Sequence, residues 1–212
     1  MSMDREIPQE PVKTERDSAD SLGPASPDEA LAVLSEGNRR FVAGLAAGPR
    51  RDPARLREVA PRQAPFAAFL GCADSRVPVE LVFDQGFGDL FVVRLAGNIA
   101  STEAIASLEF SVAVLGVKIL YILGHSSCGA VAATIRAEPV PGQISTLFQH
   151  IRPAVRAAKG DLEASIIENV REQATIVAEA SPVIAGLIRE GKVKVVGGVF
   201  HLASGVVEPV VI

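Results

Sequence analysis

Short apolar runs alternate with stretches of helical periodicity along most of this chain, and this alternation limits the folds open to it. Three continuous apolar runs stand at PFAAFLGC (65–72), DLFVVRLAG (89–97) and VKILYILGH (117–125). Runs without polar alternation are typical of strands buried on both faces of a sheet. Helical patterns follow the second and third runs, as STEAIASLEFSVAVLG and CGAVAATIRAE. The pattern predicts an α/β fold with a central, mostly parallel sheet flanked by helices.

The two ends of the chain frame this core. The stretch SPDEALAVLSEGNRRFVAG (26–44) predicts an N-terminal helical arm, capped by Ser26 and with Pro27 at its first position. A long helical region with two breaks is expected from about 143 to 189. KVKVVGGVFHLASGVVEPV (192–210) then predicts a closing strand and hairpin.

Composition narrows the class of protein further. Residues 1–25 hold many Asp, Glu, Ser and Pro, which predicts a mobile tail before a single domain at 26–212. A net charge of −4 gives no reason to expect nucleic acid as a partner. The longest apolar stretch, interrupted by Lys118, is shorter than the ~20 residues of a membrane span. With two cysteines and no apolar signal-peptide core, we expect a cytoplasmic protein with reduced thiols.

Reactive side chains stand directly after two of the predicted core strands. Cys72, Asp74 and Arg76 follow the first run, and His125 and Cys128 follow the third. In open α/β sheets, sites form outside the carboxyl ends of the strands, so the two groups would share a pocket. Two cysteines and a histidine suit zinc, and three protein ligands leave a fourth position open, as in catalytic sites. We therefore predict a zinc site made by Cys72, His125 and Cys128.

The motifs CADSR and HSSCG at this separation resemble the two signatures of β-class carbonic anhydrases. The resemblance covers about residues 26–212 and includes EGNRRF, VFDQGFGDLFVVRLAGN and GGVFHLASGVV. Members of that family interconvert carbon dioxide and bicarbonate and assemble as dimers, tetramers or larger forms, with the active site at the dimer interface. The resemblance implies a zinc lyase, a carbonate dehydratase, acting on carbon dioxide and bicarbonate as a homodimer or homotetramer.

The resemblance also implies roles for the two charged residues of the first motif. Asp74 would accept a hydrogen bond from a zinc-bound water and orient the resulting hydroxide. Arg76 would hold Asp74 off the metal through a bidentate pair. In a closed state, Asp74 would instead be the fourth metal ligand. The sequence leaves open which state is the resting one.

Further residues match family positions that line the substrate pocket. Gln63 stands where the family places a glutamine that hydrogen-bonds bicarbonate. Phe91, Ala96 and Gly129 match positions around the small apolar pocket for carbon dioxide. Phe110 stands where some members carry a tyrosine, so any polar role at that position is in doubt.

Other functions fit parts of the same pattern. A hydrolase of carbonyl sulfide or carbon disulfide would use the same fold and site. A dithiol redox sensor would use Cys72 and Cys128 without metal, although their spacing is not C-x-x-C and His125 would be idle. A structural zinc protein would keep Asp74 as a permanent ligand, but such a site has no need for Arg76.

Overall fold

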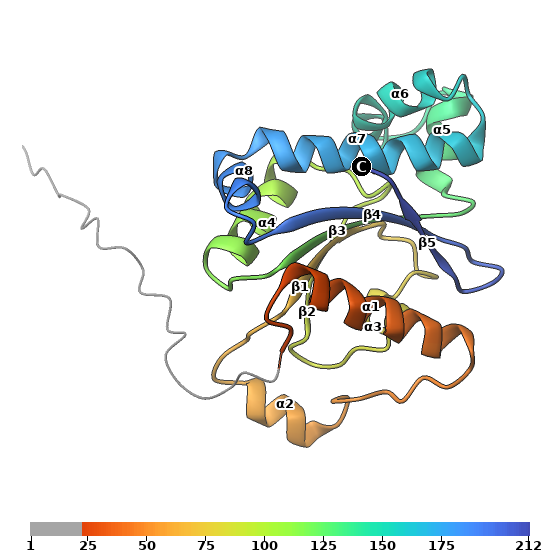
Figure 1. Ribbon diagram of the computed structural model, residues 1–212. Helices are drawn as coiled ribbons and strands as arrows, with labels where there is room; N and C mark the ends of the chain where they lie inside the picture. The colour runs from red at the N-terminus through yellow and green to blue at the C-terminus, as the bar shows by residue number, and fades with distance from the viewer. Residues whose placement is uncertain (1–22) are drawn as a thin grey trace, which may run out of the picture.

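The computed structural model describes residues 23–212, and one twisted sheet runs through its centre (Figure 1). The strands stand in the order β2-β1-β3-β4-β5; the first four are parallel, and β5 runs antiparallel to β4. Their bounds are β1 Ala67–Gly71, β2 Leu90–Arg94, β3 Ile119–His125, β4 Lys194–Phe200 and β5 Val207–Val210. The predicted α/β class, with a mostly parallel sheet and a C-terminal hairpin, is confirmed.

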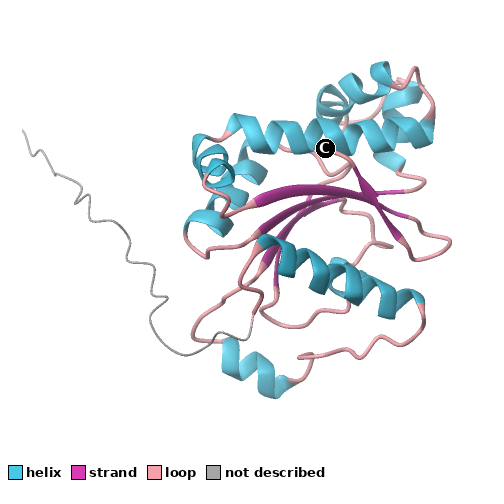
Figure 2. Cartoon of the chain, viewed as in Figure 1, coloured by secondary structure: helices cyan, strands magenta, loops and turns pink. Residues whose placement is uncertain are grey.

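Helices cover both faces of the sheet. Their bounds are α1 Pro27–Val42, α2 Pro53–Val59, α3 Val79–Val82, α4 Thr102–Ala113, α5 Gly129–Arg136, α6 Ser145–Ala157, α7 Leu162–Ala180 and α8 Pro182–Arg189. Figures 1 and 2 show α4 to α8 on one face, α1 and α3 on the other, and α2 furthest from the sheet. The long helical region expected at 143–189 is thus three helices, whereas the four-residue α3 was not predicted. No helix in the described part of the chain combines the length and apolarity needed to cross a bilayer.

The N-terminal helix begins as its sequence predicts and packs against its own chain. The Ser26 hydroxyl accepts a hydrogen bond from the Glu29 amide, and Pro27 is the first helical residue. Near the other end of α1, the buried Asn38 amide donates to the carbonyls of Val82 and Gly205. The helix is therefore fastened to the loop before the C-terminal strand. Of the predicted tail at 1–25, residues 1–22 lie outside the described residues, and the single domain at 26–212 stays a prediction.

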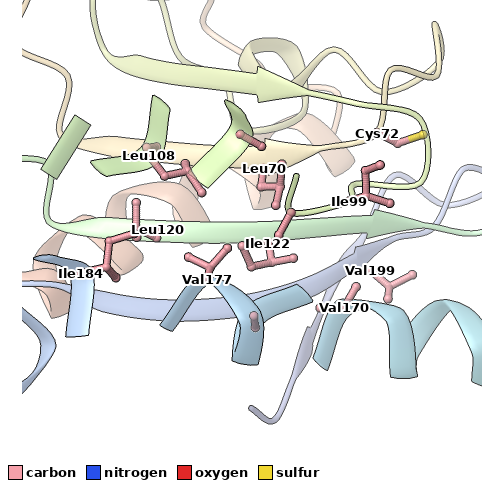
Figure 3. Close-up of a cluster of buried hydrophobic side chains, with 14 of the residues drawn as sticks. Leu70, Cys72, Ile99, Leu108, Leu120, Ile122, Val170, Val177, Ile184 and Val199 are labelled. Atoms are coloured by element: carbon pink, nitrogen blue, oxygen red, sulfur yellow. The ribbon is translucent and has the colours of Figure 1, made fainter. Parts of the chain in front are cut away.

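The core lies on both sides of the sheet because β1 and β3 bury every residue. Figure 3 shows the cluster on the α7 side, with Cys72 and Ile99 together at one end of it. Strand β2 differs from the expectation of a fully buried strand, since it is an edge strand and all five of its residues are only half-buried. No strand among residues 23–212 pairs with the outer edge of its apolar run LFVVR.

Candidate active site

The sheet topology brings the two predicted groups of reactive residues together. Cys72 directly follows β1, His125 is the last residue of β3, and these strands are parallel neighbours. Cys128 caps the N-terminus of α5 after a tight turn, in which Ser127 has a φ of 55°. The sulfur atoms and an imidazole nitrogen of the three residues all lie within 4.8 Å of one another, and all three side chains are buried. A single ion fits between groups this close.

The imidazole of His125 is arranged as a ligand would be. Its Nδ1 lies 2.9 Å from the carbonyl oxygen of Ser126, which fixes the ring and leaves the Nε2 lone pair free. Nε2 is buried and has no hydrogen-bond partner within residues 23–212. Buried polar nitrogens without partners are rare because they lose their hydrogen bonds to water and gain no hydrogen bond within the protein. The orphaned atom, next to two cysteine sulfurs, fits a metal ion that prefers nitrogen and sulfur.

The two thiols titrate as a pair. Hydrogen bonding to Cys128 lowers the pKa of Cys72, while the same interaction raises the pKa of Cys128. Burial would lower the pKa of His125, but the adjacent Cys72 sulfur raises it overall. The interaction between the two sulfurs therefore favours the thiolate at Cys72 and disfavours a second thiolate at Cys128. A divalent cation would stabilise the second thiolate, as metal binding to cysteine requires.

Asp74 and Arg76 form the bidentate pair that the sequence predicts. The Arg76 Nε donates to Asp74 Oδ1 at 2.9 Å, and Nη2 donates to Oδ2 at 2.8 Å. These hydrogen bonds hold the pKa of Asp74 well below its usual range, against the opposing effect of burial. Asp74 Oδ2 also lies 3.8 Å from the Nε2 of His125. The carboxylate therefore faces the cluster of the three ligand candidates while Arg76 occupies both of its oxygens.

Arg94 belongs to the same site, although sequence reasoning missed it. Its Nε donates to the Cys72 carbonyl at 2.8 Å, and its Nη2 donates to the Asp74 carbonyl at 2.5 Å. Arg94 therefore ties the backbone of the CADSR motif to the end of β2. A signal was present in the sequence, because Arg94 is the one charged residue within the apolar run LFVVRLAG.

Two of the predicted substrate-pocket residues lie at the same end of the sheet as the ligand candidates. Gly129 follows Cys128 and opens α5, and open space surrounds the position where a side chain would start. Ala96 is half-buried in the segment after β2, next to Gly97, whose amide donates to the Cys72 sulfur at 3.3 Å. Gly129 therefore leaves free space next to Cys128, and Ala96 lies next to the residue that contacts the Cys72 sulfur.

The remaining pocket residues lie elsewhere in this chain. Gln63 is exposed in the loop before β1, so it and Cys72 flank that strand at opposite ends, and five residues span about 16 Å. Phe91 is paired with Ala68 near the start of β1 and β2, and its ring packs 6.3 Å from that of Phe110. One chain alone therefore does not bring these three residues to the ligand cluster.

Comparison with known proteins identifies the family to which this chain belongs. A model of the carbonic anhydrase family matches residues 67–207, a range that holds Cys72, His125 and Cys128. The chain belongs to the carbonic anhydrase family. Carbonic anhydrases are lyases, so the enzyme class inferred from CADSR and HSSCG is confirmed.

Several carbonic anhydrases resemble this one over most of their length. A carbonic anhydrase of Mycolicibacterium smegmatis is 36% identical over 192 residues, covering 87% of this chain and 93% of its relative. Carbonic anhydrase 2 of Mycobacterium tuberculosis is 37% identical over 188 residues, covering 85% and 91% of the two chains. The predicted resemblance is thus supported by full-length relatives as well as by motifs.

Solved structures place the enzyme in the β class. A β-carbonic anhydrase of Coccomyxa, in complex with acetazolamide, matches with a TM-score of 0.68 and 30% identity, covering 84% of this chain and 85% of that one. One of two tetrameric β-carbonic anhydrases from Sordaria macrospora matches with a TM-score of 0.67 and 26% identity, covering 86% and 96%. The predicted β class is confirmed.

Proposed function

We propose that this carbonic anhydrase uses zinc, held by Cys72, His125 and Cys128, to hydrate carbon dioxide reversibly to bicarbonate and a proton. The buried His125 Nε2, without a partner and within 4.8 Å of both sulfurs, carries this proposal. Two sulfurs and one nitrogen leave a fourth position of a tetrahedral ion open, as catalysis needs. When bound, zinc acidifies the water that attacks carbon dioxide.

The Asp74–Arg76 pair supplies the orientation for this reaction. Asp74 faces the ligand cluster and accepts a hydrogen bond from the attacking water, which directs a lone pair of that water at the substrate. Arg76 holds both carboxylate oxygens at 2.8 to 2.9 Å. The resting state we propose is therefore the open one, because a carboxylate engaged by a guanidinium is a poor competitor for the metal.

The substrate pocket, in this proposal, is completed by a second copy of the chain. Gln63, Phe91 and Phe110 lie towards the far end of β1 and β2, away from Cys72. Within residues 23–212, β2 is an edge strand with no strand paired to its outer side, and Phe110 on the adjacent α4 and Val114 directly after that helix are 46% and 42% exposed. An isologous dimer across this apolar surface would exchange residues between the two sites. The tetrameric relatives from Sordaria macrospora are consistent with such assembly.

Mixing two inactive variants tests the shared pocket. Chains carrying Gln63→Ala and chains carrying Asp74→Asn are unfolded together and refolded, so that hybrid dimers form. If a site combines both chains, one site of each hybrid contains both defects and the other is intact, and activity returns. No recovery in hybrids verified by mass spectrometry, or an active monomer in sedimentation, would contradict the proposal.

Metal analysis combined with a carbon dioxide hydration assay tests the function itself. We expect about one zinc per chain and higher activity at pH about 8.5 than at pH about 7, because two thiolates reduce the charge that acidifies water. A metal-free active protein, or a zinc-loaded protein without hydration activity, would contradict it. Parallel assays with carbonyl sulfide and carbon disulfide separate the hydrolase alternative, and location in the cytoplasm stays a prediction.

A further inference from the structure

The segment between β2 and α4 is held by two amide side chains of α7. Asn169 Nδ2 donates to the carbonyl oxygen of Gly97 at 2.9 Å. Gln173 Oε1 accepts a hydrogen bond from the Ala100 amide at 2.8 Å. Both amides are almost completely buried, with 1% and 0% of their surface exposed. In Figure 3, Ile99 of this segment lies beside Cys72, at the end of the cluster where Val170 of α7 is also seen.

This segment reaches the proposed metal site through one peptide group. The Gly97 amide donates to the Cys72 sulfur at 3.3 Å, while the Gly97 carbonyl is the group that Asn169 binds. Gly97 has a φ of 76°, and a Cβ there would lie 2.7 Å from Ile151 Cδ1. The conformation therefore requires glycine, and both ends of this residue are fixed by hydrogen bonds.

The two amides also support each other. Gln173 Nε2 donates to Asn169 Oδ1 at 3.3 Å and to the His150 carbonyl at 3.1 Å. Asn169 additionally reaches Asn98 Oδ1 at 3.4 Å. Linked hydrogen bonds thus run from α6 through α7 to the peptide that contacts the Cys72 sulfur. Such buried networks fix one arrangement of their members.

The two amides replace apolar residues on the buried side of α7, which indicates that they orient the peptide groups between β2 and α4. Asn169 and Gln173 interrupt the buried stripe of α7, whose other members include Ile166, Val170 and Ala174. Apolar residues at both positions would bury more apolar surface but would not orient a peptide. Asn98, left-handed at a φ of 44°, has a buried Nδ2 without a partner among the described residues. The segment therefore retains an unfavourable local arrangement that the contacts from α7 must maintain.

We propose that Asn169 and Gln173 are positioning residues of the metal site. They hold the Gly97 peptide in the orientation that donates to the Cys72 sulfur, although neither side chain is itself among the ligand candidates. Mutating a residue that orients a metal ligand typically lowers metal affinity or activity about 10- to 100-fold. The inference rests on the zinc site proposed above, and it makes zinc affinity dependent on a helix that supplies no ligand.

Zinc affinity, measured by competition with a chelator, separates this role from a merely structural one. We expect Asn169→Leu and Gln173→Met to bind zinc about 10- to 100-fold more weakly than wild type. The thiolate-to-metal absorption band of the cobalt-substituted protein should shift in both variants. Gln173→Glu keeps the acceptor for the Ala100 amide and should retain more affinity than Gln173→Met. Asn169→Asp, which keeps only the acceptor for Gln173, replaces Asn169→Leu if that variant does not fold.

Asn38→Leu is the matched control, because Asn38 is a buried amide on the opposite face that binds three backbone groups. It should lower the melting temperature without changing zinc affinity by more than about twofold. The inference is overturned if folded Asn169 and Gln173 variants keep wild-type affinity and absorption, or if affinity falls equally in the control. A wild-type protein that binds no zinc would instead overturn the proposed function, and the inference with it.

Discussion

Two aspartates that follow β1 in the sequence, Asp84 and Asp74, each pair with arginine but differ in what surrounds them. The Asp84 side chain is fully buried. Arg40 Nε donates to it at 2.7 Å, Arg51 Nη2 lies 3.5 Å away, and two backbone amides of the loop after α1 donate to its oxygens. Every acceptor direction of Asp84 is used, so this carboxylate fastens α1 and its loop to the fold.

Asp74 keeps part of its capacity to accept hydrogen bonds. Its side chain is 17% exposed, Arg76 is the one arginine paired with it among residues 23–212, and that arginine is itself half-exposed. Its Oδ2 faces His125 at 3.8 Å. An aspartate–arginine pair serves structure when it is buried and all its hydrogen-bonding positions are used. It can serve a reaction when one side stays open towards a substrate.

Replacing Asp74 should give the largest effect and should leave the fold intact. We expect zinc-loaded Asp74→Asn to lose about 100-fold or more of its hydration activity, because the attacking water is no longer oriented by a carboxylate. Stopped-flow carbon dioxide hydration measures the loss, with zinc content and melting temperature as controls. Wild-type turnover in this variant would remove the distinction between the two aspartates.

Replacing Asp84 should give the opposite result. Asp84→Ala leaves Arg40 and Arg51 without their buried partner, so we expect the free energy of unfolding to fall by about 3 kcal/mol. The value is at the low end for broken buried pairs because both arginines reach solvent. Chemical denaturation measures it. Unchanged stability, or loss of zinc from the folded fraction, would show that Asp84 does not act mainly by stabilising the fold.

A smaller change, made at Arg76, tests whether Asp74 must be held by both of its oxygens. Arg76→Lys keeps the charge but cannot bind both carboxylate oxygens in a fork. We expect about a tenfold loss of hydration activity, and a larger loss for Arg76→Ala, with zinc retained in both. Equal activity in the lysine variant and wild type would mean that only the charge of Arg76 matters.

The smallest effect concerns acid stability. Burial would raise the pKa of Asp84, but the hydrogen bonds from Arg40 and two backbone amides lower it below its ordinary value of 3.8. The ionised carboxylate therefore stabilises the fold above that value, and this contribution is lost as pH falls through the lower folded-state pKa. The stability difference between wild type and Asp84→Asn should shrink from pH about 6 to pH about 3. A constant difference in denaturation experiments would contradict this.

The site could be predicted from sequence where it depends on strand ends. Cys72 and His125 end short apolar runs that are typical of buried strands, and parallel neighbours bring such ends together. Arg76 lies two residues from Asp74, so that pair is set by local geometry. Long-range contacts were not predictable in the same way. Nothing in the periodicity of α7 shows that Asn169 binds Gly97, 72 residues earlier.

In the fold, too, features set by neighbouring residues could be predicted, whereas features set by distant parts of the chain could not. The Ser26 cap and the breaks between α6, α7 and α8 follow from nearby residues and were predicted. The exposure of β2 depends on strand order, which apolar content does not reveal, so its run LFVVR was expected in the core. Four-residue α3 is too short to produce a periodic signal.

X-ray absorption at the zinc edge of the purified wild-type protein tests the central claim most directly, because it reports the atoms that surround the metal. The account predicts two sulfur neighbours at about 2.3 Å and two nitrogen or oxygen neighbours at about 2.0 to 2.1 Å. Cys128→Ser should remove one sulfur neighbour or the metal itself. A zinc ion surrounded only by nitrogen and oxygen, or a chain that binds no zinc, would contradict the assignment of Cys72, His125 and Cys128.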